Sequence, residues 1–480
     1  MTTILKTALG GAFLKFANSY LENVKILDEI LLPDRSFDII KRRLVIGKNE
    51  LTMYYIDGFV KDQNMQKLMM HFISLKGLPS EAQRFVDENV PYVEVETADN
   101  SDEAVMMVLS GGVVLVGDTF GNEVVLIDLR TYPVRGVEEP ESDRVMRGAR
   151  DGFVETLIFN TALIRRRIRD ARLRVVYKSI GSTSKTDIAV VYLEGAADNK
   201  YVKWLLDKLS KLKVDSLPMG QQSLAESLIG KKWYNPFPKI RYTERPDTAS
   251  AQIVEGSVLL LCDTSPDAMI LPTSIFDFLQ ETGDYYFPPF TGTYLRIVRH
   301  CIFWLTLFLV PLWYLLVMHP QYVPQWLSFI VPDDHGKIPL VAQLFLVEFV
   351  IDGLKLASMN TPSMLNNSLS VVGGLILGDF AVDIGWLIPE VILYMAFVAI
   401  ANFTQASYEL GYAVKFMRMI LLAVTAIFGV YGFVLGLIGI ILLIATNATI
   451  NCKHSYLYPL IPFNAKALAR LMLRLKKPKP

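Results

Sequence analysis

An uncharged apolar run of 18 residues, CIFWLTLFLVPLWYLLVM, occupies positions 301–318. A helix needs roughly 20 apolar residues to cross a bilayer, so this run is just long enough to span one. Trp304, Trp313 and Tyr314 lie within it, and aromatic residues are enriched at membrane interfaces. We therefore expect part of the chain to be embedded in a membrane.

Charged side chains divide the 480 residues into two unlike parts. Residues 300–480 contain 19 Lys, Arg, Asp and Glu, whereas residues 1–299 contain 77. A charged fraction of about a quarter is typical of a soluble domain, and a far lower one with long apolar runs is typical of a membrane region. The net charge is zero and the first part has no long basic run, which argues against nucleic acid as a partner.

No residue pattern indicates a catalytic centre, a metal or another cofactor. The three cysteines have no spacing typical of a zinc site or of a disulfide framework, which fits a reducing cytoplasm. Phosphate-binding glycine motifs, HExxH and GxSxG are missing from the sequence. We expect His71 to be structural, and Asp118 and Asp263 to cap turns at strand ends rather than bind metal.

Two stretches of the soluble part resemble each other. Residues 46–58 and 180–195 each combine Ile-Gly, a polar turn, a strand-like run and an acidic residue followed by glycine. Further on, GVVLVGDT (112–119) parallels GSVLLLCDT (256–264). The repetition predicts two similar α/β subdomains with buried strands, and chance similarity is the alternative.

The expected fold class is α+β joined to a membrane domain: two similar α/β cytoplasmic subdomains followed by an α-helical transmembrane bundle. The expected domains are an N-terminal helical segment (1–40), subdomain I (41–145), a basic connecting helix with subdomain II (146–290), a membrane domain of four to six crossings (291–450) and a basic tail (451–480). Segment 339–358 is a possible re-entrant or amphipathic helix. Basic residues before the 301–318 run place the soluble part in the cytoplasm, and the basic residues of the tail place the tail there. Lys415 and Arg418 place an expected loop before position 418 on the same side.

Residues 155–169 predict a helix between the subdomains. Phe159 and Leu163 are expected on its apolar face, and three arginines surround that face: Arg165, Arg167 and Arg169. Two interpretations stay open. The helix is either a solvated connector that forms salt bridges with nearby acids, or a docking site for acidic headgroups or a partner subunit.

Three charged residues interrupt the apolar segment 341–359. Glu348, Asp352 and Lys355 are spaced by four and three, which places them on one helical face. Charge at membrane depth is costly and usually faces a bundle interior or an aqueous path. The segment is either an interfacial helix whose charges snorkel to water, or a helix that lines a polar conduit or holds a gate by ion pairs.

Further polar and small residues follow in the apolar region. Asp379 and Asp383 are one helical turn apart and could form acidic rings in an oligomer. Asn402, Thr404 and Gln405 form a polar break that either lines a cavity or ends a helix. Four glycines at helical spacing are expected to allow close helix packing, and a hairpin is the alternative for the last two: Gly374, Gly378, Gly432 and Gly436.

Ordered blocks along nearly the whole chain resemble the A subunit of GerA-type spore germinant receptors. They include VETLIFNTALIRRRIRDARLRV (154–175), VEFVIDGLKLA (347–357), SVVGGLILGDFAVDIGWLIPE (370–390) and SYELGYAVKFMR (407–418). The GGLILGDFAV core and the ending SYLYPLIPFNAKAL (455–468) are most similar to the stage V sporulation branch of the family.

The resemblance implies a non-enzymatic, multi-pass protein of the spore inner membrane, with its N-terminal domain and its tail on the spore core side. It implies a ring-like homo-oligomer, a pentamer in the family model, whose pore region corresponds to Glu348, Asp352 and Lys355. The expected function is an ion channel subunit that releases monovalent cations and amplifies germination. The alternatives are an accessory to dipicolinate and calcium transport, or a scaffold for receptor clusters. Expected partners are other spore germination membrane proteins and membrane lipids, without nucleic acid.

Overall fold

The computed structural model describes residues 15–60, 62–130, 148–229, 234–334, 336–360, 381–447, 450 and 455–473. The chain forms two compact units. Unit 1 comprises Met1–Gly230 and Ile240–Pro272, and unit 2 comprises Lys231–Lys239 and Thr273–Pro480.

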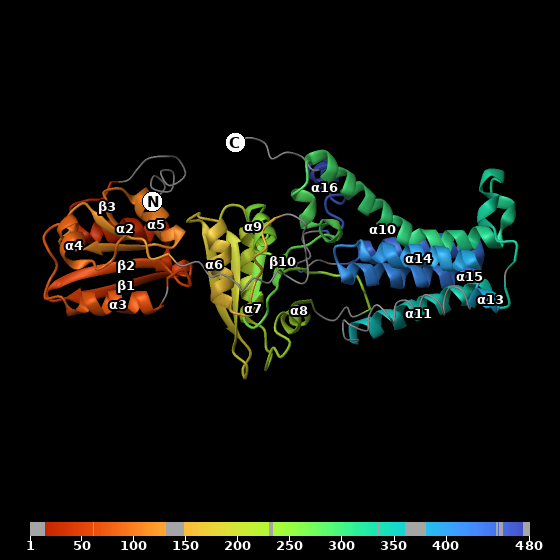
Figure 1. The fold of residues 1–480 in the computed structure, drawn as a ribbon, viewed down its shortest axis with the longest axis horizontal. Helices are drawn as coiled ribbons and strands as arrows, with labels where there is room; N and C mark the ends of the chain where they lie inside the picture. Colours follow the sequence, from red (N-terminus) through yellow and green to blue (C-terminus); the bar gives the residue numbers. More distant parts are fainter. Residues whose placement is uncertain are drawn as a thin grey trace. The chain divides into compact units, whose positions relative to one another are not determined.

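Unit 1 contains two five-stranded sheets with the same strand order. Figure 1 shows the two sheets as separate groups of arrows, each with helices beside it. The first runs β1 (Ile39–Ile46), β2 (Asn49–Ile56), β4 (Val113–Gly117), β5 (Val124–Ile127) and β3 (Val95–Ala98). The second runs β6 (Leu173–Ile180), β7 (Thr186–Leu193), β9 (Val258–Cys262), β10 (Ala268–Leu271) and β8 (Arg241–Thr243). Every neighbouring pair in both sheets is antiparallel, so unit 1 is α+β.

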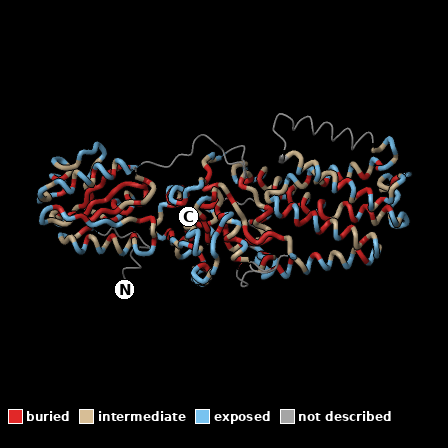
Figure 2. Tube along the Cα trace, turned by 90° about the horizontal axis from the view of Figure 1, so that it is seen from below, coloured by how far each residue is buried: buried red, intermediate tan, exposed pale blue. Residues whose placement is uncertain are grey.

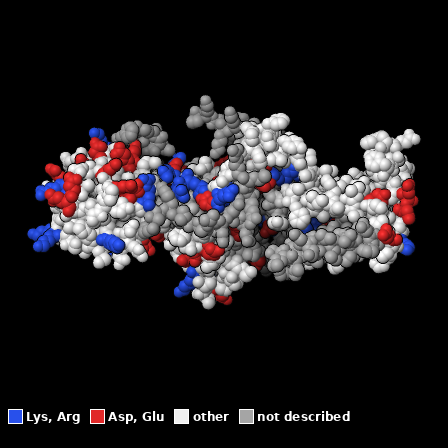
Figure 3. Space-filling model, viewed as in Figure 1, with Lys and Arg blue, Asp and Glu red and all other residues white. Residues whose placement is uncertain are grey.

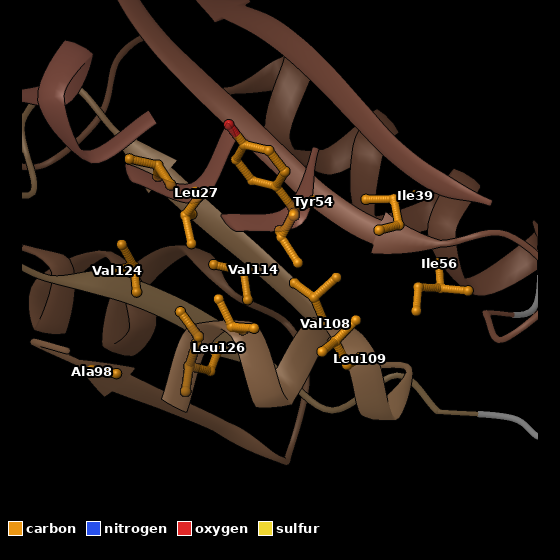
Figure 4. Close-up of a cluster of buried hydrophobic side chains, with 14 of the residues drawn as sticks. Leu27, Ile39, Tyr54, Ile56, Ala98, Val108, Leu109, Val114, Val124 and Leu126 are labelled. Atoms are coloured by element: carbon orange, nitrogen blue, oxygen red, sulfur yellow. The ribbon is translucent and has the colours of Figure 1, made fainter. Parts of the chain in front are cut away.

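Helices cover both faces of the first sheet, and we call this sheet and its helices lobe 1. They are α2 (Tyr20–Leu31), α3 (Asp62–Ser74), α4 (Ala82–Asn89) and α5 (Ser101–Ser110). Side chains alternate across a strand, so Tyr54 of β2 packs with Leu27 of α2 and Val108 of α5 (Figure 4). Its neighbour Met53 packs on the other face with Phe72 of α3. Lobe 1 therefore has three layers.

Lobe 2 is the second sheet with its helices. These are α6 (Leu157–Arg167), α7 (Asn199–Ser210), α8 (Gln221–Ile229) and α9 (Pro246–Val254). Leu163 and Ile164 of α6 pack with Ile253 of α9 and the inner strands. Figure 2 shows buried residues concentrated in the sheets of both lobes. The strands expected near 51–56 and 188–193 are present, and each pairs with a preceding strand that the sequence patterns did not reveal, β1 or β6.

Unit 2 is helical. Its elements are η2 (Ile275–Leu279), η3 (Thr282–Tyr285), α10 (Pro289–Met318), η4 (Pro320–Tyr322), η5 (Gln325–Ile330), α11 (Leu340–Asn360), α13 (Ala381–Asp383), α14 (Pro389–Phe403), α15 (Tyr408–Ala445) and α16 (Ala465–Met472). Among the described residues, α10 and α15 are the two helices long and apolar enough to cross a membrane. The helix α11 has 21 residues but carries three charged ones.

The helix α15 folds back on itself. Gly429 adopts φ 59° and ψ −135°, which is not helical. A Cβ atom added to Gly432 would lie 2.2 Å from the carbonyl oxygen of Val424, and one added to Gly436 would lie 2.6 Å from Cδ1 of Leu421. Residues so far apart in one straight helix could not touch. The two arms of α15 therefore form a hairpin, and the two glycines lie where its arms meet.

Candidate functional site: a charge network between α11 and α15

Three buried charged side chains and one half-buried one meet between α11 and α15, and we call them the charge network: Glu348, Lys415 and Arg418, with Asp352 half-buried. Arg418 Nη2 donates a hydrogen bond to Glu348 Oε2 at 2.7 Å. Lys415 Nζ lies 3.3 Å from Glu348 Oε1 and forms a second ion pair with Asp352. The spacing of four on α11 and of three on α15 brings each acid opposite a base.

The centre of the network is shielded from solvent. Glu348 is 6% exposed, and Lys415 and Arg418 are each 4% exposed. Arg418 Nη1 also donates to the backbone oxygen of Thr306 on α10, at 3.2 Å. The network thus joins three helices, and its two acids balance its two bases.

Lys355 shares the charged face of α11 but has different neighbours. Its Nζ lies 4.7 Å from the ring centroid of Phe403 and 5.8 Å from that of Tyr412. These are cation–π distances. In the described part of the chain, no ion pair joins Lys355 to an acid.

A buried network of this kind holds helices in one register and offers no reaction chemistry. Removing charges from water is costly, so such groups persist only when each is paired and hydrogen bonded. Loss of one partner leaves an uncompensated buried charge, which makes the α11–α15 contact sensitive to small displacements.

The structure brings together only some of the predicted site residues. Glu348 and Asp352 lie in the network, and Lys355 lies one turn further along α11. Asp383 is exposed at the end of α13. Three predicted residues fall outside the described ranges: Gly374, Gly378 and Asp379.

The two basic members of the network were missed as site residues. Lys415 and Arg418 were expected in a cytoplasmic loop, and that expectation is wrong because α15 begins at Tyr408 and buries both. The available signal was their spacing: two bases three residues apart in one apolar segment match two acids four residues apart in another. Opposite charges at such spacings can pair across two helices.

The arginines of α6 also differ from the docking interpretation. Arg165 is fully buried and forms a two-pronged ion pair with Asp38 of lobe 1, at 2.9 and 3.2 Å. A buried guanidinium is not accessible to a headgroup, so docking does not fit Arg165. Arg167 pairs with Asp151 at 2.6 Å, as the salt-bridged connector would, and Arg169 is exposed. Phe159 is exposed as well, so it lies off the buried face.

Polar residues singled out in unit 1 make structural contacts. His71 Nε2 is 2.9 Å from the backbone oxygen of Asn89. Asp118 accepts a hydrogen bond from the Glu50 backbone N–H, and Asp263 accepts one from the Leu157 backbone N–H at the start of α6. Burial raises the pKa of the Cys262 thiol to about 11, so this thiol stays protonated and unreactive near neutral pH.

Comparison with known proteins identifies the family. The model of the Bacillus/Clostridium GerA spore germination protein matches residues 25–479. Stage V sporulation protein AF of Bacillus subtilis (strain 168) is 39% identical over 447 residues, covering 92% of this chain and 90% of that protein. Spore germination protein KA of the same strain is 26% identical over 450 residues, covering 92% of this chain and 81% of that protein.

Solved structures are also similar to this chain. One is the crystal structure of the N-terminal domain of the A subunit of the Bacillus megaterium spore germinant receptor GerK3, with a TM-score of 0.41 and 26% identity. The match covers 54% of this chain and 97% of that one. The family match over nearly the whole sequence confirms the resemblance seen in the residues. This chain belongs to the GerA family of spore germination proteins.

Proposed function

We propose that this protein is an ion-conducting subunit of a ring-like homo-oligomer in the spore inner membrane, acting in germination and without an enzymatic step. The observation that carries the proposal is the charge network. Glu348, Lys415 and Arg418 are buried among helices whose outward side chains are largely apolar. Charge kept at such a depth is typical of ion pathways and of their gates.

The outer surface of unit 2 supports a membrane location. Phe349, on α11 beside Glu348, is 77% exposed, and exposed apolar side chains also cover α14 and α15. Figure 3 shows charged atoms spread over unit 1 and sparse along the helices of unit 2. Residues 320–332 contain no charged residue, and Tyr322, Trp326 and Phe329 are exposed there. Such aromatic residues suit the interface between lipid and water.

The paired state of the network corresponds to a closed pathway. Glu348 and Asp352 are neutralised by Lys415 and Arg418, so they offer little attraction to a cation in this state. Separation of α11 from α15 would free both acids, and Asp379 with Asp383 could form acidic rings around the same axis in the oligomer. Conduction of monovalent cations then follows from opening the network.

The sidedness and partners in the proposal follow the family resemblance. Unit 1 and the basic tail face the spore core, which agrees with the basic residues Arg296 and Arg299 before the most apolar part of α10. Other spore germination membrane proteins and membrane lipids are the proposed partners.

Ion flux from liposomes tests the proposal. The full-length protein is reconstituted with entrapped K⁺, and release is compared for the native chain, Glu348→Ala, Asp379→Ala and the control Asp333→Ala, whose side chain is exposed. We expect K⁺ release that both of the first two substitutions alter and the control leaves unchanged. Absence of flux from well-folded oligomers would contradict conduction. Altered dipicolinate content in dormant mutant spores would instead favour the transport accessory, and silent network substitutions would favour a scaffold.

A further inference from the structure

A corner of unit 2 next to the charge network contains buried polar atoms without partners. We call it the α14–α15 corner, formed by Lys355, Asn402, Gln405 and Tyr412. In the described structure, Asn402 Oδ1 and both Oε1 and Nε2 of Gln405 are buried and make no hydrogen bond. Buried polar groups in native proteins are nearly always satisfied, by water or an ion where no protein group is in reach. These atoms therefore indicate that water or an ion completes the corner.

The four residues come from α11, from the end of α14, from the turn after it and from the start of α15. A Cβ atom on Gly411 would lie 2.5 Å from Asn402 Oδ1, so the start of α15 touches the end of α14. Lys355 of α11 lies over Phe403, the neighbour of Asn402, and over Tyr412, the neighbour of Gly411. The ammonium group thus lies over two rings that flank the contact between Asn402 and Gly411 in the sequence, at the turn from α14 to α15 that also contains Gln405.

The charge balance decides the sign of the ligand. Glu348 and Asp352 are already paired with Lys415 and Arg418. Lys355 is a third base on the same helical faces, and no acid of the described structure pairs with it. The remaining oxygen of Asp352, Oδ1, has no hydrogen bond, but its carboxylate charge is already balanced by Lys415. Glu409, the acid in the first turn of α15, forms no ion pair with Lys355 in the described structure either, so no ion pair balances the positive charge of Lys355.

We propose that the α14–α15 corner binds a small monovalent anion, such as chloride or a short carboxylate. Lys355 supplies the charge, and Gln405 and Asn402 supply N–H donors, since rotation of a side-chain amide exchanges its oxygen and its NH₂ group. A hydrogen bond to a charged partner is roughly twice as strong as a neutral one. The bound anion would tie α11 to the α14–α15 turn. This site goes beyond conduction and does not depend on it.

Thermal unfolding of the full-length protein in detergent tests the site. Chloride or acetate replaces the large anion gluconate, while the ionic strength and the cation are kept constant. The midpoint temperature of unfolding is measured at each concentration of the small anion. We expect a saturable rise with the small anion, because a ligand of the folded state raises stability. Lys355→Gln should raise the apparent Kd at least tenfold, which is about 1.4 kcal/mol. Lys355→Arg should retain binding.

Two matched variants sharpen the assignment. Lys337→Gln removes a lysine at the other end of α11, where Nζ donates to the backbone oxygen of Ile384 at 2.8 Å, and should leave the anion effect intact. Gln405→Leu leaves Lys355 in place but removes the amide group, so this substitution should weaken the anion effect. An anion effect that is absent from the native chain, or unchanged in Lys355→Gln, overturns the site. A midpoint temperature that instead depends on the cation, measured when K⁺ replaces choline, also overturns the proposed anion site. Because no gradient is used, these outcomes are separate from those of the flux assay.

Discussion

The two units each bury charged side chains, but the two sets are built differently. In unit 1, Arg165 donates to both oxygens of Asp38 and to the backbone oxygens of Asp170 and Leu173. In unit 2, the network leaves one oxygen of Asp352 without a partner. The first set is fully satisfied, and the second is not. Buried charges that are fully satisfied suit a fixed connection, whereas buried charges that are incompletely satisfied suit a contact that changes.

Hydrogen bonds near Arg165 also support a fixed connection between the two lobes. Ser36 Oγ accepts a hydrogen bond from the Val175 backbone N–H at 3.0 Å, and the Phe37 N–H donates to the Val175 backbone oxygen at 3.0 Å. A segment of lobe 1 thereby covers the edge strand β6 of lobe 2, which leaves that edge less open to other chains. The ion pair and these backbone bonds act at one place to join the lobes.

The largest effect is expected from breaking the satisfied pair. Arg165→Met should lower the free energy of unfolding of unit 1 by about 3 to 5 kcal/mol, because Asp38 is left charged and buried. Denaturant titration read by thiol labelling of the buried Cys262 measures the loss. Arg172→Met is the control: Arg172 pairs with Asp170 on the surface, so the loss should be below about 1 kcal/mol. Equal effects of the two substitutions would contradict the fixed connection.

An intermediate effect is expected from the network. Arg418 and Glu348 should show a coupling free energy of about 1 to 3 kcal/mol in a double-mutant cycle of Glu348→Gln and Arg418→Met, since they share one buried hydrogen-bonded pair. Thermal unfolding of the full-length protein in detergent provides the four values. Additive effects would show that the two side chains do not interact.

An effect of similar size is expected at the hairpin that carries the two bases. Gly432→Ala places a methyl group against the Val424 backbone oxygen and should cost about 1 to 3 kcal/mol, the usual range for overpacking. Gly439→Ala is the matched control, because no atom lies within 4 Å of its added Cβ, and helix propensity favours alanine. The thermal midpoint of Gly432→Ala should therefore lie below that of Gly439→Ala. If Gly439→Ala is the more damaging, the arms do not meet as described.

Sequence patterns predicted most of the two sheets but not their edges. The inner strands are continuous apolar runs, such as Val258–Cys262, which are easily recognised. The edge strand β1 reads IIKRRLVI, and its exposed residues Lys41, Arg42 and Arg43 break the alternation that marks a strand. Its antiparallel pairing with β2 follows from the two-residue turn between Ile46 and Asn49, whereas its role beside lobe 2 depends on residues far away in the sequence, which no local pattern contains.

The candidate site was predicted in part for a related reason. The helical spacing of Glu348 and Asp352 follows from the sequence, whereas their partners depend on which helix packs against α11. Arg165 shows the opposite error: an arginine-rich stretch resembles a surface helix, and only the fold reveals that Asp38 lies inside to receive one of its charges. Hydrophobic periodicity does not reveal such pairs, because it treats every charge as exposed.

The most direct test of the central claim is K⁺ release from liposomes by three forms of the full-length protein: the native chain, Glu348→Arg, and the swapped pair Glu348→Arg with Arg418→Glu. If the network holds the pathway closed, the single substitution raises release by placing two like charges together, and the swap restores it towards the native rate. Equal release from all three forms, with oligomers of equal size, would contradict the role of the network in gating.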